Sequence, residues 1–72
     1  MPNNGNAPDR DQYRTSTELR LLREKVDLTQ EEAAEFLYVS VKKYRNWEYG
    51  VTLLPRAIYE FFEIKARYAG RL

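Results

Sequence analysis

Lys42 and Asn46 are the side chains of this sequence whose type and spacing suggest the most specific chemistry. They are four positions apart, so a helix would carry them on one face, opposite Tyr44 and Trp47. An asparagine amide can pair with N6 and N7 of adenine, and a lysine ammonium can reach O6 and N7 of guanine. The pair therefore predicts contact with base edges in the major groove of double-stranded DNA.

The neighbouring residues Lys43, Arg45 and Tyr49 are suited to a different part of a duplex. We expect them to contact phosphates, which position a helix on DNA without reading its sequence. The alternative interpretation is an ordinary basic helix surface that is simply solvated. Val41 begins the same segment and has two equally supported roles: contact with a thymine methyl group, or packing of the preceding turn.

The helices that must position these side chains can be recognised from their caps. Residues Thr15–Glu18 have the spacing of a capping box and predict a helix that begins at Thr15 or Ser16 and ends at residues 27–28. Thr29–Glu32 form a second capping box, which opens a second helix. A hydroxyl cap, a helix-ending glycine and a helix-initiating proline then bound a third helix and begin a fourth, at Ser40, Gly50 and Pro55.

Composition excludes several classes of function. The chain has no cysteine and no histidine, which removes disulfides, thiolate metal sites and the commonest general base. Carboxylates are plentiful, but without those residues or a glycine-rich phosphate loop no catalytic constellation assembles. We therefore expect neither an enzyme nor a metal or other cofactor. No stretch has the apolar length of a signal peptide or a membrane span, so we expect a cytoplasmic protein.

The charges are distributed unevenly along the chain, although the net charge is only +1. Residues 18–37 carry three more acids than bases, whereas residues 38–50 and 51–72 each carry two more bases than acids. Such a dipolar chain can present one phosphate-binding face. Residues 1–14 are polar and rich in proline and asparagine, which predicts a disordered tail before a single domain over residues 15–72.

Several of these residues together form a recognisable pattern: Thr29-Gln30, then Ala33-Ala34, a turn, Ser40, and finally Trp47-Glu48-Tyr49-Gly50. Over residues 18–65 the chain resembles the Cro/repressor type of helix-turn-helix family. The resemblance implies an all-α fold: a compact bundle of four to five helices of the lambda-repressor-like DNA-binding type. One departure is Tyr38, where the family usually has a glycine in a left-handed turn.

The resemblance also implies roles for individual residues. It suggests that Gln30 contacts the DNA backbone and that Val41, Lys42 and Asn46 meet base edges. It further suggests a salt bridge between Arg23 and Glu48, which border the apolar stripes of the first and third helices. Unpaired, these two charges would be costly at such positions, whereas a bidentate pair is tolerable.

The function that the resemblance implies is sequence-specific binding of double-stranded DNA. A homodimer on a palindromic operator would repress transcription by blocking RNA polymerase, as is typical of small regulators from phages and mobile elements. The sequence shows no domain for a small-molecule effector and no membrane partner. The alternative is a protein-interaction module, such as an antitoxin or adaptor, whose basic helix binds another protein.

Dimerisation is expected from surplus apolar residues near the end of the chain. Residues 51–54 are apolar for a loop, and the apolar side chains of the last helix cover an arc of about 220°, where about 100° suffices to contact one core. A second copy of the chain could cover that surplus. The residues expected at the dimer interface are Leu53, Leu54, Ile64 and Tyr68.

Overall fold

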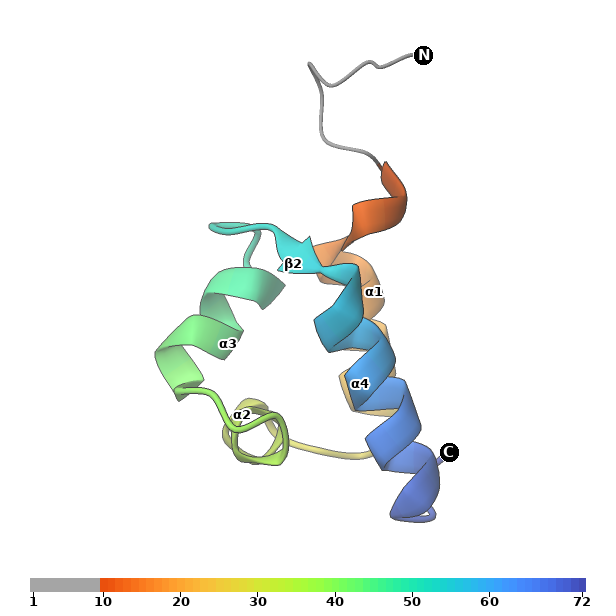
Figure 1. The fold of residues 1–72 in the computed structure, drawn as a ribbon. Helices are drawn as coiled ribbons and strands as arrows, with labels where there is room; N and C mark the ends of the chain where they lie inside the picture. The colour runs from red at the N-terminus through yellow and green to blue at the C-terminus, as the bar shows by residue number, and fades with distance from the viewer. Residues whose placement is uncertain (1–9) are drawn as a thin grey trace.

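The computed structural model describes residues 10–72, which form four α-helices held at one end by a short two-stranded ribbon (Figure 1). The predicted helical bundle is confirmed, with the small addition of the ribbon. In chain order the elements are a 3₁₀ turn η1 (Arg10–Gln12), β1 (Tyr13–Arg14), α1 (Ser16–Lys25), α2 (Gln30–Phe36), α3 (Val41–Glu48), β2 (Leu54–Pro55) and α4 (Arg56–Tyr68).

Side-chain caps fix where the first three helices begin. The Thr15 hydroxyl accepts from the backbone N–H of Glu18, and the Glu18 carboxylate accepts in return from the backbone N–H of Thr15. Thr29 and Glu32 form the same reciprocal pair at α2, and the Ser40 hydroxyl caps α3. Each cap satisfies amides that have no partner within the first helical turn.

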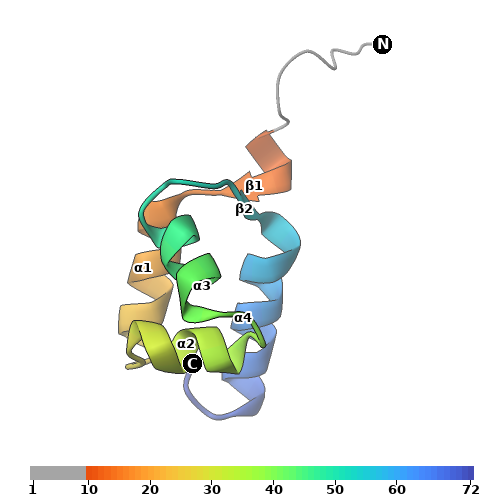
Figure 2. The ribbon, with the colours of Figure 1, turned by 90° about the vertical axis from the view of Figure 1, so that its left-hand side faces the viewer.

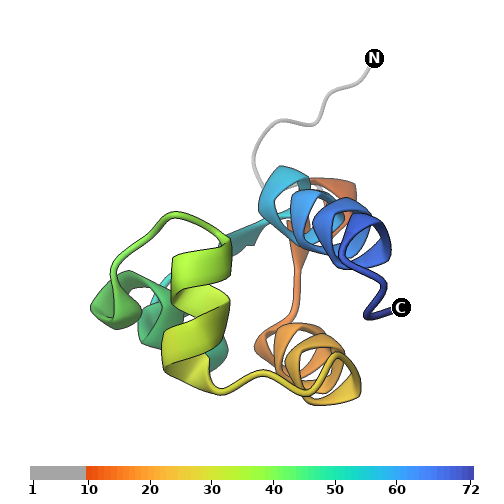
Figure 3. The same ribbon diagram turned by 90° about the horizontal axis from the view of Figure 1, so that it is seen from below.

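The ribbon aligns α1 with α4. Strands β1 and β2 pair antiparallel, with Tyr13 opposite Pro55 and Arg14 opposite Leu54. Because each strand leads into a helix, α1 and α4 begin at the same end of the domain and run in the same direction, and Figure 3 shows the two helices end-on and apart from each other. At their other end, a guanidinium N–H of Arg71 donates to the carbonyl oxygen of Val26 at 2.9 Å.

One hydrophobic core joins the four helices. Its largest fully buried side chains are Leu19, Val26, Tyr44, Leu54 and Phe62. Helix α2 contributes two small buried residues, Ala33 and Ala34, which let α3 pack closely against it (Figure 2). The core therefore lies between the helix-turn-helix pair, α2 and α3, and the parallel pair, α1 and α4.

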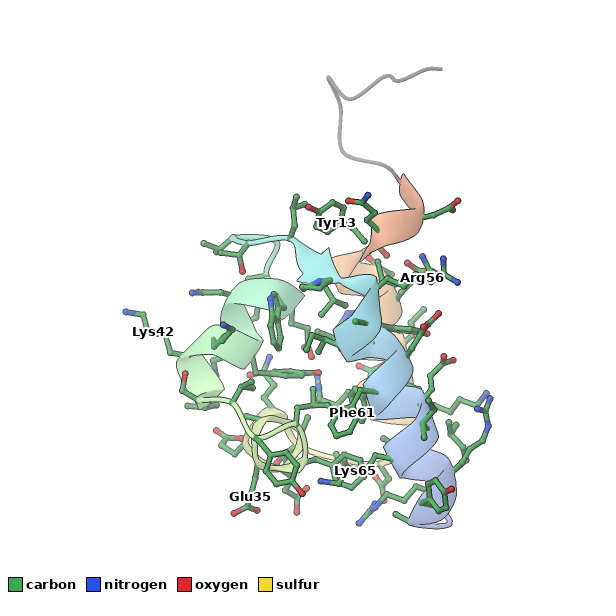
Figure 4. The ribbon with its side chains drawn as sticks, in the orientation of Figure 1. Tyr13, Glu35, Lys42, Arg56, Phe61 and Lys65 are labelled. Atoms are coloured by element: carbon green, nitrogen blue, oxygen red, sulfur yellow. The ribbon has the colours of Figure 1, made fainter. Side chains whose placement is uncertain are left out.

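The turn between α2 and α3 contains Tyr38 in the left-handed conformation, with φ of 60°. This conformation costs an ordinary L-residue about 1–2 kcal/mol. The Tyr38 ring lies over the ammonium of Lys65, with 4.0 Å between the nitrogen and the ring centre, and the same nitrogen donates to the carbonyl of Phe36 at 2.7 Å. Lys65 thus ties the strained turn to α4, and Figure 4 shows it pointing toward α2.

Four details differ from the sequence-based expectation. Residues 10–14 of the predicted tail are part of the fold, since β1 pairs with β2, while residues 1–9 lie outside the described residues. Helix α1 ends at Lys25, before residues 27–28. Pro55 is the residue before α4 and not its first residue, because its backbone is extended, with ψ of 138°, and pairs with Tyr13 in the ribbon. Leu54 is 1% exposed and belongs to the core.

Within residues 10–72, no helix has both the length and the apolar character needed to cross a membrane.

Candidate nucleic-acid interface

Helix α3 has one buried face and one solvent face. Tyr44 and Trp47 are 0% and 4% exposed and anchor the helix in the core. Lys42 is exposed and points away from the body of the domain (Figure 4), and Asn46 is half-buried on the same solvent face. Within the described residues, neither the Lys42 ammonium nor the Asn46 amide forms a hydrogen bond or ion pair, so both remain available to a ligand.

Two neighbours extend the solvent face. Lys43 is exposed, and its ammonium lies 5.7 Å from the centre of the Trp47 ring, within the range of a cation–π contact. Val41 is half-buried and packs against the core at the beginning of α3. Of the two roles left open for Val41, packing is therefore present in the protein without DNA.

The polar residues beside α3 form a single network, here called the Gln30 network. The Gln30 amide N–H donates to the Glu48 carboxylate at 3.0 Å. The Gln30 carbonyl oxygen accepts from Arg45 Nε at 3.0 Å and from the Tyr49 hydroxyl at 3.3 Å. Because both ends of its amide are bonded, Gln30 fixes the position of Arg45 and Tyr49. The members of the network are Arg23, Gln30, Glu31, Arg45, Glu48 and Tyr49.

Arg23 and Glu48 form the buried end of this network. Arg23 donates through Nε and Nη2 to the two carboxylate oxygens of Glu48, at 2.8 and 2.9 Å. The side chains are 16% and 2% exposed, and the Nη1 of Arg23 also donates to the carbonyl of Leu28 at 3.0 Å. This bidentate geometry, which the resemblance implied, joins α1 to α3.

Burial and hydrogen bonding act in opposite directions on Glu48. Burial raises the pKa of the Glu48 carboxyl, but the Arg23 guanidinium, the Tyr44 hydroxyl and the Gln30 amide lower it more in sum, so the pKa lies below its usual value. The Glu48 partner likewise raises the pKa of Arg23. Burial, and then the Glu48 charge, raise the pKa of Tyr44, which stays a neutral phenol.

Arg45 lies at the exposed end of the network. In addition to its bond to Gln30, it donates through Nη2 to the carboxylate of Glu31 at 2.5 Å. The side chains of Arg45 and Glu31 are 38% and 64% exposed. Glu31 was read from the sequence only as a residue of the second capping box, and no spacing rule relates it to Arg45, because the two lie on different helices.

A family model described as helix-turn-helix matches residues 19–58, which is more than half of the chain. The chain belongs to the helix-turn-helix family. The match begins in α1, includes all of α2 and α3, and ends in the first turn of α4. This Cro/repressor-type helix-turn-helix is a DNA-binding domain, and the solvent face of α3 is its candidate DNA-reading surface.

One relative is a type II methyltransferase, M.MspI of Moraxella sp, which is 43% identical to this chain over 49 residues. The matched segment is 68% of this chain but 12% of the methyltransferase. No solved structure matches the chain. The similarity therefore concerns a helix-turn-helix segment and leaves most of the methyltransferase unmatched.

The structure brings together most of the residues that the sequence assigned to DNA. Val41, Lys42, Lys43 and Asn46 lie on or beside the solvent face of α3, and Gln30, Arg45 and Tyr49 lie next to it in one network. The residues assigned to the dimer interface are separated. Leu53, Ile64 and Tyr68 are exposed at 60%, 50% and 90%, whereas Leu54 is 1% exposed and lies in the core.

Proposed function

We propose that this helix-turn-helix binds double-stranded DNA in a sequence-specific manner and regulates transcription, acting as a repressor. The observation that carries the proposal is the solvent face of α3, where Lys42 and Asn46 are held outward by the buried Tyr44 and Trp47 and have no partner among the described residues. A lysine and an asparagine on one helical face suit guanine and adenine edges. Val41, beside them, packs against the core, and the part of its side chain that stays exposed suits contact with a thymine methyl.

The surrounding residues supply the contacts that fix the helix on the duplex. Lys43 is exposed beside the reading face, and Arg45 and Tyr49 are aligned by Gln30 at its edge. These side chains suit phosphate oxygens, which orient the protein without reading sequence. Repression follows most simply from occlusion, since a domain bound over a promoter excludes RNA polymerase without a further activity.

We propose that a homodimer is the DNA-binding form. Four residues of α4 form an uncovered apolar line, the α4 stripe, at spacings of four, three and four residues: Ala57, Phe61, Ile64 and Tyr68. Leu53 is exposed in the loop between α3 and α4. Apolar patches of this kind are rarely left uncovered on a monomer. A two-fold pair would set its reading helices about 34 Å apart, one turn of DNA, and would require a palindromic operator.

Selection of bound sequences from a random duplex library tests the DNA reading. Asn46→Ala and Lys42→Ala should each weaken the cognate site by about 1–3 kcal/mol and relax preference at one base pair per half-site. Lys43→Ala should weaken all duplexes alike and lower the salt slope by about one unit. Lys25→Ala, at the exposed end of α1, is the matched control and should change neither. An unchanged motif in the Asn46→Ala/Lys42→Ala double variant would exclude α3 as the reader.

Sedimentation tests the dimer separately. Leu53→Glu/Ile64→Glu should convert a dimer to a monomer, because the variant places charge on the proposed contact. Leu21→Glu is the control, since Leu21 is 53% exposed on α1 and outside the α4 stripe. A wild-type protein that stays monomeric at high micromolar concentration, with and without DNA, contradicts the proposal.

The second candidate is a protein-interaction module, such as an antitoxin or adaptor, whose basic helix binds a protein. The exposed α4 stripe favours it if a second copy does not cover that surface. Loss of duplex binding with rising salt together with a preferred palindrome supports the DNA reader, and absence of both supports the module. Methyl transfer is not proposed, because the match to the methyltransferase covers 12% of that protein.

A further inference from the structure

Arg45 is the phosphate-directed arginine of the proposed interface, yet it already has an acidic partner. Its Nε donates to the Gln30 carbonyl oxygen at 3.0 Å, and its Nη2 donates to the Glu31 carboxylate at 2.5 Å. Glu31 is 64% exposed and lies on the same side of the domain as the residues assigned to phosphates. A phosphate that approaches Arg45 must therefore either displace the Glu31 carboxylate or share Arg45 with it, although both groups are negatively charged.

We propose that Glu31 competes with DNA phosphates for Arg45 and so limits the affinity of the domain for every duplex. This inference rests on the proposed DNA-binding function and assigns one residue a role within it. The Arg45–Glu31 pair is exposed on both sides, so water and salt screen it and a phosphate can replace it. Binding is then weakened by the loss of the ion pair and by repulsion between Glu31 and the phosphate.

Gln30 explains why Arg45 does not need Glu31 for its orientation. The Gln30 amide is held by the buried Glu48 at 3.0 Å, so its carbonyl oxygen presents a fixed acceptor to Arg45 Nε. Removing the Glu31 charge leaves that bond in place and leaves Nη2 available for a phosphate. Glu31 therefore acts on the charge available to DNA and not on the position of the guanidinium.

Glu31→Gln tests the inference because it removes the charge and keeps the shape of the side chain. It should bind cognate and non-cognate duplexes about two- to fivefold more tightly per half-site, the range expected for an exposed ion pair. Its salt slope should steepen by about one unit, since Arg45 would release a full counterion. Glu35→Gln is the matched control: it lies on the same helix, is exposed, and forms no ion pair among residues 10–72.

An Arg45→Ala background separates competition from a general change of charge. If Glu31 acts through Arg45, then Glu31→Gln should gain no more than the Glu35→Gln control in that background. An equal gain with and without Arg45 overturns the competition, and so does a Glu31→Gln variant that binds more weakly than wild type, which would make Glu31 a positioning residue. Wild type that fails to bind any duplex, at any salt concentration, overturns the proposed function as well and is recognised before the variants are compared.

Discussion

Replacing Arg23 by methionine should destabilise the domain by an amount that depends on pH. The change removes two hydrogen bonds from a carboxylate that is 2% exposed and leaves Glu48 with the Gln30 amide as its remaining hydrogen-bond donor. Breaking a buried pair by removing one partner costs about 3–5 kcal/mol. Glu48 can avoid the cost of a buried, unpaired charge by taking up a proton. Protonation costs 1.36 kcal/mol for each pH unit above the unfolded pKa of about 4.3, so the destabilisation caused by the unpaired charge cannot exceed about 4 kcal/mol at pH 7.

The sign of the pH dependence follows from the two states of Glu48. In the wild type its pKa is depressed, so its contribution is present above the unfolded value of about 4.3 and is lost as pH falls through the folded pKa. In Arg23→Met the folded pKa is raised, so the charged form is penalised at neutral pH. Lowering the pH from 7 to 5 should therefore reduce the largest destabilisation that the unpaired Glu48 charge can cause, from about 4 to about 1 kcal/mol.

Urea unfolding measures these energies through the fluorescence of Trp47, the only tryptophan, which is 4% exposed. A domain of this size has a free energy of unfolding of about 4–11 kcal/mol. The free energy of unfolding of Arg23→Met can therefore be measured at pH 5 even if the variant is largely unfolded at pH 7. Glu48→Leu should cost less, because Arg23 is 16% exposed and keeps its bond to the Leu28 carbonyl. The double variant should show a coupling of about 2–3 kcal/mol. Coupling below about 0.5 kcal/mol, or an Arg23→Met cost that is equal at pH 5 and pH 7, refutes this reasoning.

Three further predictions concern stability and are checked by the same urea assay. Tyr38→Ala should destabilise by about 0.5–1 kcal/mol, because it keeps the left-handed turn and loses the contact with Lys65, whereas Tyr38→Gly should be close to neutral because it also removes the strain; equal losses for both would contradict this. Tyr44→Phe should change stability by less than about 1 kcal/mol, because the buried Tyr44 hydroxyl has no partner at hydrogen-bond distance among the described residues, which favours its removal, but it also lowers the pKa of the nearby Glu48, which favours its presence; a change of more than about 2 kcal/mol in either direction would contradict this balance. Wild-type stability should fall as pH drops below about 4.3, because Glu48 and Glu32 both have lowered pKa values, and a flat profile there would argue against both carboxylates.

Local signals accounted for most of the helix positions. The two capping boxes and the Ser40 cap each involve residues within one helical turn, so their spacing in the sequence is also their spacing in space. Gly50 at the end of α3 has φ of 77°, a conformation that glycine adopts without strain. Elements that depend on distant partners were missed: β1 exists only because residues 54 and 55 lie beside it.

The same distinction explains why Leu54, expected at a dimer surface, lies in the core. Leu53 and Leu54 are adjacent and chemically identical, yet one is 60% exposed and the other 1%. Leu54 is the first residue of β2 and pairs with Arg14, which holds it against the core, whereas Leu53 precedes the strand and lies in the loop after α3. A sequence that shows no strand gives no means of assigning the two.

The Gln30 network shows why only part of the candidate interface could be predicted from the sequence. Its buried ion pair and the DNA-backbone contact of Gln30 were implied by the resemblance, and Arg45 and Tyr49 were assigned to phosphates as neighbours of Lys42 and Asn46. What the fold adds is connection: Glu48 fixes Gln30, Gln30 fixes Arg45, and Arg45 meets Glu31, at distances of 3.0, 3.0 and 2.5 Å. Stability and DNA affinity therefore share side chains, and a substitution at Gln30 is expected to change both. A substitution at Glu31, at the exposed end of the chain of contacts, is the one that separates affinity from folding.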